Sequence, residues 1–90
     1  MVKVVELKEG MKDIDIAVEI DYIPPRFKGG DWGIIFVKDD TKDIKMILTG
    51  KKMKIAKEGM KIKITNGNVT KNRGELQLNP SKDIPIKFID

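Results

Sequence analysis

The sequence predicts an all-β fold, a five-stranded Greek-key barrel with a short helix between the third and fourth strands. Three observations predict it. Apolar and polar residues alternate along most of the chain, which is the period of a half-buried strand. Glycine, proline, asparagine and aspartate separate the alternating segments. The chain has 90 residues, which suits one domain with a small core, either a whole protein or one domain of a longer one.

The first part of the chain predicts a long strand with an acidic outer face. Residues 2–9 predict a short strand or a helical turn, and residues 11–23 then alternate clearly. Four aliphatic residues face inward and four acids face outward: Ile14, Ile16, Val18 and Ile20 against Asp13, Asp15, Glu19 and Asp21. Carboxylates at every second strand position are typical of a solvated face. Pro24 and Pro25 end the strand, because proline cannot donate to the hydrogen-bond ladder.

Residues 32–48 predict a β-hairpin around the polar turn at residues 38–43. With Asp40 and Thr41 at the centre of the turn, Trp32 lies opposite Thr49 and Phe36 lies opposite Lys45. The inward residues are then Ile35, Val37, Ile44, Met46 and Leu48. The other face also carries apolar residues, so it is either buried or in contact with a ligand. Trp32 and Phe36 are accordingly either core residues or ligand-facing residues.

The rest of the chain predicts the helix and the last two strands. Residues 51–58 predict a helix that ends at Gly59, with Met53 and Ala56 closing one end of the barrel. Residues 60–65 predict the fourth strand, residues 66–68 a turn or bulge, and residues 75–79 the fifth strand after a turn at residues 72–74. The tail is expected to pack along the barrel through Ile84, Ile86, Phe88 and Ile89. This order of elements is that of an OB-fold.

Composition narrows the function. The net charge is +4, and residues 25–63 carry eleven basic and five acidic residues. This excess indicates an anionic partner such as nucleic acid, although lysines also serve simply as a solvated surface. Cysteine and histidine are absent and Ser81 is the only serine, so we expect no enzyme, no cofactor and no metal site, although a carboxylate-only magnesium or calcium site stays open. The sequence shows neither a membrane span nor a signal peptide, which predicts a cytoplasmic protein without a membrane partner.

The loop at residues 26–31 combines Arg26, Phe27 and Lys28 with two glycines. A guanidinium and an aromatic ring beside mobile backbone suit phosphate contact and base stacking. The alternative is that Phe27 folds down as a plug on the core and the glycines only turn the chain.

Three segments, KEGMKDIDIAVEIDYIPPRF, VKDDTKDIKMIL and AKEGMKIKITNGNVTKNRGELQL, resemble the single-stranded DNA-binding domains of archaeal replication protein A. The shared features are Gly10, the Arg-Phe pair, the acid-acid-Thr turn, the Glu-Gly-Met entry to the fourth strand and the late Asn-Arg-Gly-Glu-Leu segment. The sequence departs from the pattern at Lys42, where many members have glycine, and at Thr49, where many have an aromatic residue. A stacked base is worth about 1–3 kcal/mol, so the missing ring at Thr49 gives Trp32 more weight.

The resemblance implies non-catalytic binding of single-stranded DNA, or of RNA, across the second and third strands. Nine residues inherit this role: Arg26, Phe27, Lys28, Trp32, Phe36, Lys45, Lys71, Asn72 and Arg73. Further OB-fold domains and other replication proteins are the protein partners that the resemblance allows. The alternative function is a protein-interaction or assembly module, because some OB-folds bind protein.

Overall fold

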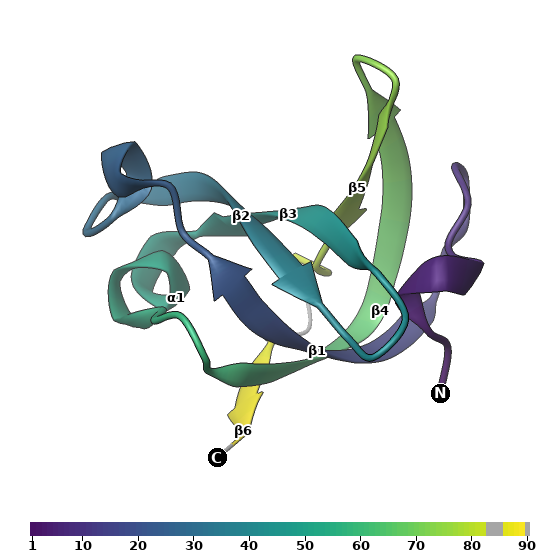
Figure 1. Ribbon diagram of the computed structural model, residues 1–90, viewed down its shortest axis with the longest axis horizontal. Coiled ribbons are helices and arrows are strands. Elements are labelled where there is room, and N and C mark those ends of the chain that lie inside the picture. The colour runs from purple at the N-terminus through teal and green to yellow at the C-terminus, as the bar shows by residue number, and fades with distance from the viewer. Residues whose placement is uncertain (83–85, 90) are drawn as a thin grey trace.

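Six strands, one α-helix and two 3-10 turns make up the computed structural model, which describes residues 1–82 and 86–89. The elements are η1 (Val4–Glu6), β1 (Ile14–Tyr22), η2 (Pro25–Phe27), β2 (Trp32–Lys38), β3 (Asp43–Thr49), α1 (Gly50–Ile55), β4 (Lys61–Asn72), β5 (Glu75–Asn79) and β6 (Lys87–Ile89). The sheet order is β1-β2-β3-β5-β4, and an additional β1–β4 pairing closes it into a barrel (Figure 1). The predicted OB-fold is confirmed.

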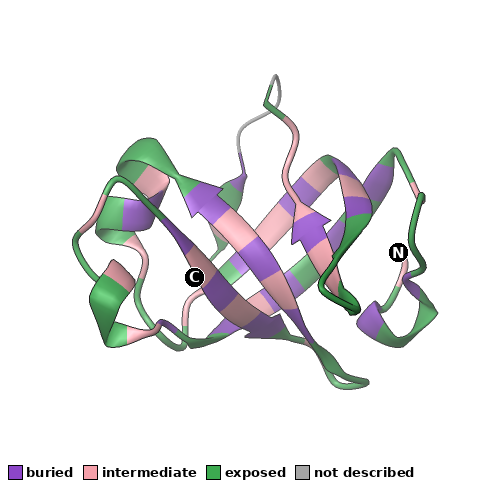
Figure 2. Cartoon of the chain, turned by 90° about the horizontal axis from the view of Figure 1, so that it is seen from above, coloured by how far each residue is buried: buried purple, intermediate pink, exposed green. Residues whose placement is uncertain are grey.

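The core forms because buried and exposed residues alternate along the strands (Figure 2). All four inward residues predicted for β1 are buried, and so are all five predicted for the β2–β3 hairpin. The β2–β3 register is also the predicted one, with Trp32 opposite Thr49 and Phe36 opposite Lys45. Register was predictable here because a slip of one residue would expose the whole inward set.

The helix is shorter than predicted. α1 ends at Ile55, because Ala56 already has extended backbone angles (φ −65°, ψ 137°). Gly59 therefore does not terminate the helix. Its φ is +92° and its N–H donates to the Ile20 carbonyl at 2.8 Å, so it forms the turn that leads into β4. Met53 is 1% exposed and Ala56 packs against the core, which confirms that they close the barrel end.

The C-terminal residues add a sixth strand that the sequence did not predict. β6 pairs antiparallel with the first residues of β4, where Ile62 lies opposite Phe88. Ile86 is buried and Phe88 packs partly against the core, whereas Ile89 is exposed. Ile84 lies outside the described residues. The sequence predicted only that the tail packs along the barrel, whereas Lys87–Ile89 form a strand within it.

Asn66 and Gly67 form a bulge inside β4, so the predicted turn or bulge at residues 66–68 is a bulge. The β1–β4 register shifts between Ile14, opposite Gly67, and Ile16, opposite Ile64. A Cβ at Gly67 would lie 3.0 Å from the Ile64 Cγ2 and 3.2 Å from the Asn79 carbonyl oxygen. A side chain at Gly67 would therefore press against both neighbours, and glycine suits this close approach between two strands.

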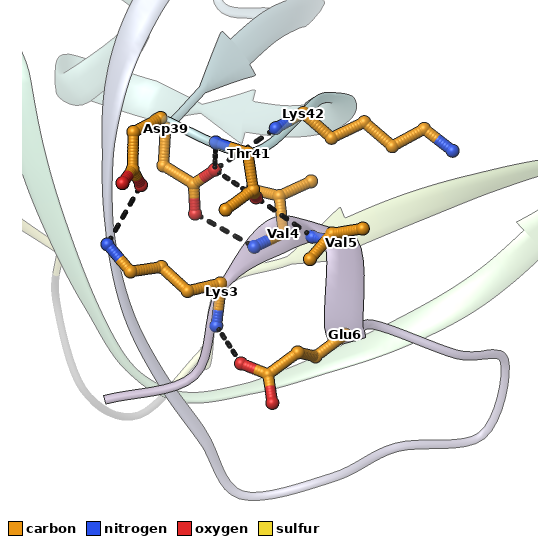
Figure 3. Close-up of polar contacts among 8 residues, drawn as sticks. Lys3, Val4, Val5, Glu6, Asp39, Thr41 and Lys42 are labelled. Carbon is orange, nitrogen blue, oxygen red and sulfur yellow. Dashed lines mark hydrogen bonds and ion pairs between the residues drawn. The ribbon is translucent and has the colours of Figure 1, made fainter.

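The N-terminal segment forms a helical turn, one of the two predicted alternatives, and is held against the β2–β3 turn (Figure 3). The Val4 N–H donates to the Asp39 carboxylate at 2.8 Å, and the Val5 N–H donates to the Thr41 hydroxyl at 3.1 Å. Lys3 and Asp40 form an ion pair at 2.9 Å. These contacts place the buried side chains of Val4 and Leu7 over the open end of the barrel.

Candidate functional site

The outward side chains of β2 and β3 form a partly apolar surface, which we call the platform. Trp32 is 55% exposed, and Phe36 and Lys45 are half-buried on the same face. Ile34 and Ile47 lie opposite each other between them. The core alternative for Trp32 and Phe36 is therefore wrong: both belong to the outer face.

The Phe27 ring packs against the Trp32 ring. Their ring centroids lie 5.3 Å apart with the planes inclined at 50°. Phe27 itself is half-buried against the core, and a Cβ at Gly33 would come within 2.7 Å of the Phe27 Cβ. Phe27 therefore packs on the core, as the plug alternative predicts, and the exposed ring at this place is that of Trp32. The Arg26 guanidinium lies 4.8 Å from the centroid of the Phe27 ring, and Lys28 is exposed.

Tyr22, at the end of β1, extends the platform next to Phe36, and the sequence analysis missed it. Strict alternation places it inward with Ile20, but the β1–β2 register shifts between these two residues. The bulge turns Tyr22 outward, opposite Phe36, where the two ring centroids are 6.1 Å apart. The chain after the bulge resumes the inward direction at Ile23, which is 2% exposed. No local sequence signal marks the bulge, because Asp21 fits an uninterrupted strand equally well.

Lys45 is neutralised within the protein. Its ammonium lies 2.6 Å from the Glu75 carboxylate across the β3–β5 contact. This parallel pairing sets Lys45 opposite Gln77 and is short, with only one further residue pair. A phosphate at Lys45 would therefore compete with Glu75, a partner that strand patterns alone do not reveal.

The β4–β5 hairpin carries the three late-loop residues, and it projects beyond the barrel (Figure 1). Lys71, Asn72 and Arg73 are all exposed. Arg73 and Gly74 have φ values of 52° and 81°, the conformation of a two-residue type I′ turn. β3 and β5 run parallel, with Lys45 opposite Gln77. Both strands therefore begin at the same end of the platform, so the tip of the β4–β5 hairpin lies at the end that holds the β2–β3 turn. The loop with Arg26 enters the opposite end, at Trp32.

Within residues 1–82 and 86–89, the cations at both ends of the platform form no ion pairs with acidic side chains. Among residues 1–82 and 86–89, the ion pairs join Lys3 to Asp40, Lys38 to Asp21, Lys45 to Glu75 and Lys54 to Asp31. Arg26, Lys28, Lys71 and Arg73 are in none of them. An extended anion lying along the platform would meet uncompensated positive charge at each end.

A row of uncharged polar side chains continues the outer face onto β5 and β4, and the sequence analysis missed it as well. The Gln77 amide donates to the Asn79 side-chain oxygen at 2.8 Å. The Asn79 amide in turn donates to the side-chain oxygens of Asn68 and Thr70, both at 3.0 Å. This network lies beside Lys45 and offers hydrogen-bonding groups without charge.

A shallow cavity of about 420 Å³ opens where the β3–β5 pairing stops. Phe36, Lys45 and Glu75 form its platform side, and Val4, Leu7, Ile44 and Leu76 are among its apolar lining residues. The platform therefore leads into an indentation at the end that faces the β4–β5 hairpin.

The described part of the chain has neither a cluster of metal-binding side chains nor a membrane-spanning helix. No three His, Cys, Asp or Glu side chains gather there in a way that would hold a metal ion. No described helix is long and apolar enough to cross a membrane.

Comparison with solved structures finds the same architecture in proteins of very different sequence. A hypothetical protein from Arabidopsis thaliana, solved in solution, superposes with a TM-score of 0.76 at 18% identity, over 96% of this chain and 70% of that one. The crystal structure of the p204 HINb domain superposes with a TM-score of 0.74 at 15% identity. It matches 99% of this chain, which spans only 47% of that one. No family model and no curated protein sequence matches the chain. At these identities the likeness shows the OB-like barrel fold alone.

Proposed function

We propose that this protein is a non-catalytic single-stranded DNA-binding module, of the kind that its sequence resemblance to archaeal replication protein A implies. The observation that carries the proposal is the exposed Trp32 ring, held over Phe27 on the outer face of an OB barrel. Bases of any sequence stack on such a ring, because every base has a π-face. The uncompensated cations at the two ends of the platform would neutralise backbone phosphates. RNA would meet the same groups.

The proposed mechanism divides the work between loops and platform. Arg26 and Lys28 at one end, and Lys71 and Arg73 at the other, supply the electrostatic part. Trp32 and Phe36 supply stacking, and the polar row led by Gln77 supplies hydrogen bonds to base edges. Because Lys45 is already paired with Glu75, we assign most of the salt-dependent affinity to the two loops.

The test is a titration of the single tryptophan with oligo-dT at several salt concentrations. Each phosphate contact contributes about −0.7 to the slope of log K against log salt for a single strand, so four loop cations predict a slope of about −3. Arg26→Ala should reduce its magnitude by roughly 0.7. Lys61→Ala is the matched control, because Lys61 is exposed on the part of β4 that pairs with β1 and β6. Folded protein at micromolar concentration that shows no salt-dependent quenching would refute the proposal.

A protein partner is the second candidate. It is favoured by the apolar Ile34–Ile47 pair at the centre of the platform and by the neutralisation of Lys45. Binding through these residues would depend little on salt, and Ile47→Glu would abolish it. The titration separates the two candidates, since only a nucleic-acid module responds to oligo-dT with the expected slope.

A further inference from the structure

The two exposed aromatic rings of the protein lie in separate places. The five aromatic residues of the sequence are all described, and only Trp32 and Tyr22 are exposed, at 55% and 47%. Each has a half-buried phenylalanine beside it: Phe27 beside Trp32 and Phe36 beside Tyr22. The surface therefore repeats one arrangement, an exposed ring resting against a ring that is fixed by packing.

The two pairs lie toward opposite ends of the platform. Trp32 begins β2, and Phe36, the neighbour of Tyr22, comes four residues later on the same face. Four residues of strand measure about 13 Å. Ile34 and Ile47 lie between the pairs, and the cationic loops lie beyond them. A strand that runs from the Arg26 loop to the β4–β5 hairpin would pass both pairs in turn.

The outward direction of the Tyr22 ring departs from the strict alternation of β1. Alternation from Ile20 would bury position 22, and burying an aromatic ring is the usual outcome for a small barrel that needs core volume. The bulge instead inserts one residue, buries Ile23 in its place and turns the ring outward. Bulges commonly re-aim a side chain beside a binding site.

From these observations we infer that Tyr22 and Phe36 form a second base-stacking site, so that the protein grips one strand of nucleic acid at two points. The inference rests on the proposed function and extends it with a ligand-contacting residue. The ~13 Å between the sites corresponds to about four nucleotides at the duplex rise of ~3.4 Å, and to fewer in a more extended single strand. An oligonucleotide of about three nucleotides would occupy one site, and one of about ten would occupy both.

The experiment measures the affinity of labelled oligo-dT of increasing length by fluorescence anisotropy, which reports the whole strand rather than Trp32 alone. Tyr22→Leu should weaken the ten-nucleotide complex by at least about fivefold, the low end for one stacked base. The salt slope should stay the same, because no phosphate contact is lost. As the oligonucleotide is lengthened, the affinity of Tyr22→Leu should stop rising at a shorter length than that of the wild type. Tyr22→Phe, which keeps the ring, should restore most of the affinity.

Ile55→Ala is the matched control, because Ile55 is an exposed apolar residue on α1. Thermal unfolding of each variant shows whether the barrel is intact. Equal affinity of Tyr22→Leu and the wild type at every length would overturn the second site and leave the proposed function standing. So would a Tyr22→Phe variant as weak as Tyr22→Leu. Absence of any oligo-dT binding by the wild type would instead remove the proposed function itself.

Discussion

The Lys45 ammonium and the Glu75 carboxylate meet at 2.6 Å across the short parallel contact between β3 and β5. The pair joins the Phe36 end of the platform to the base of the cationic hairpin. Its lysine is only 21% exposed and its glutamate is 66% exposed. Glu75 thus lies where a backbone phosphate would approach, and it already neutralises Lys45, the platform cation opposite Phe36.

Removal of the Glu75 charge is therefore expected to strengthen DNA binding. Glu75→Gln keeps the size of the side chain but frees Lys45 for a phosphate, so the oligo-dT affinity should rise several-fold and the salt slope should steepen by about 0.7. Salt titrations of Trp32 quenching measure both. Glu19→Gln makes the same charge change on β1, opposite Lys61. An equal gain in that control would show that net charge alone is responsible.

The turn of the β4–β5 hairpin allows charge to be separated from folding. Arg73 has a φ of 52°, which a β-carbon makes unfavourable and which asparagine tolerates better. Arg73→Asn creates the Asn-Gly pair that type I′ turns prefer. The thermal midpoint should stay the same or rise, while the oligo-dT affinity falls and the salt slope loses about 0.7. Loss of affinity together with loss of stability would mean that Arg73 acts through the turn.

The sequence predicted the parts of this protein that local pattern determines. The hairpin register followed from its inward set, Ile35 to Leu48, because any slip would expose five aliphatic residues. The same parity placed Trp32 on the face opposite that set, but it left open whether this face is buried or exposed. The composition of the Arg26 loop likewise left open whether Phe27 packs on the core.

What the sequence did not predict depends on contacts between distant segments. Tyr22 faces outward only because the β1–β2 register shifts beside Asp21. The Lys45–Glu75 ion pair needs the β3–β5 contact, which joins residues thirty positions apart in the chain. β6 forms because the start of β4 has an edge left free by the short β5. Bulges, parallel pairings and edge strands form only in the assembled barrel. On the platform, they account for the outward Tyr22 ring and for the Lys45–Glu75 ion pair.

Gly33 is predicted to leave the space that Phe27 needs in order to pack against Trp32. A Cβ there would lie 2.7 Å from the Phe27 Cβ and 3.2 Å from the Met53 sulfur. Gly33→Ala should therefore displace Phe27 and destabilise the fold by about 1–3 kcal/mol, the usual cost of overpacking. Urea unfolding measures the loss, and the Trp32 emission maximum should shift. In a Phe27→Gly background the same change should cost less, because the atoms it meets first are gone. Equal costs in both backgrounds would contradict this contact.

Asp39 is predicted to make stability depend on acid pH. Burial by itself raises the pKa of Asp39, but hydrogen bonds from the Thr41 hydroxyl and from the backbone N–H groups of Val4, Thr41 and Lys42 outweigh it and lower the pKa from 3.8 to about 2. The folded state thus favours the carboxylate. This stabilisation is complete above the ordinary value of 3.8 and is lost as the pH falls toward about 2.

Asp39→Asn should consequently lower the free energy of unfolding at neutral pH by about 1 kcal/mol, the usual contribution of a side-chain cap. The difference from the wild type should shrink as the pH falls from 4 toward 2, because the wild type then takes up the proton itself. Urea unfolding at several pH values measures the difference, and exchange of the Val4 amide reports the local contact. Asp40→Asn is the control: its pair with Lys3 is exposed and screened by solvent, so its loss should change the free energy of unfolding little at any pH. A gap between Asp39→Asn and the wild type that stays constant down to pH 2 would show that the charge of Asp39 does not hold the N-terminal turn.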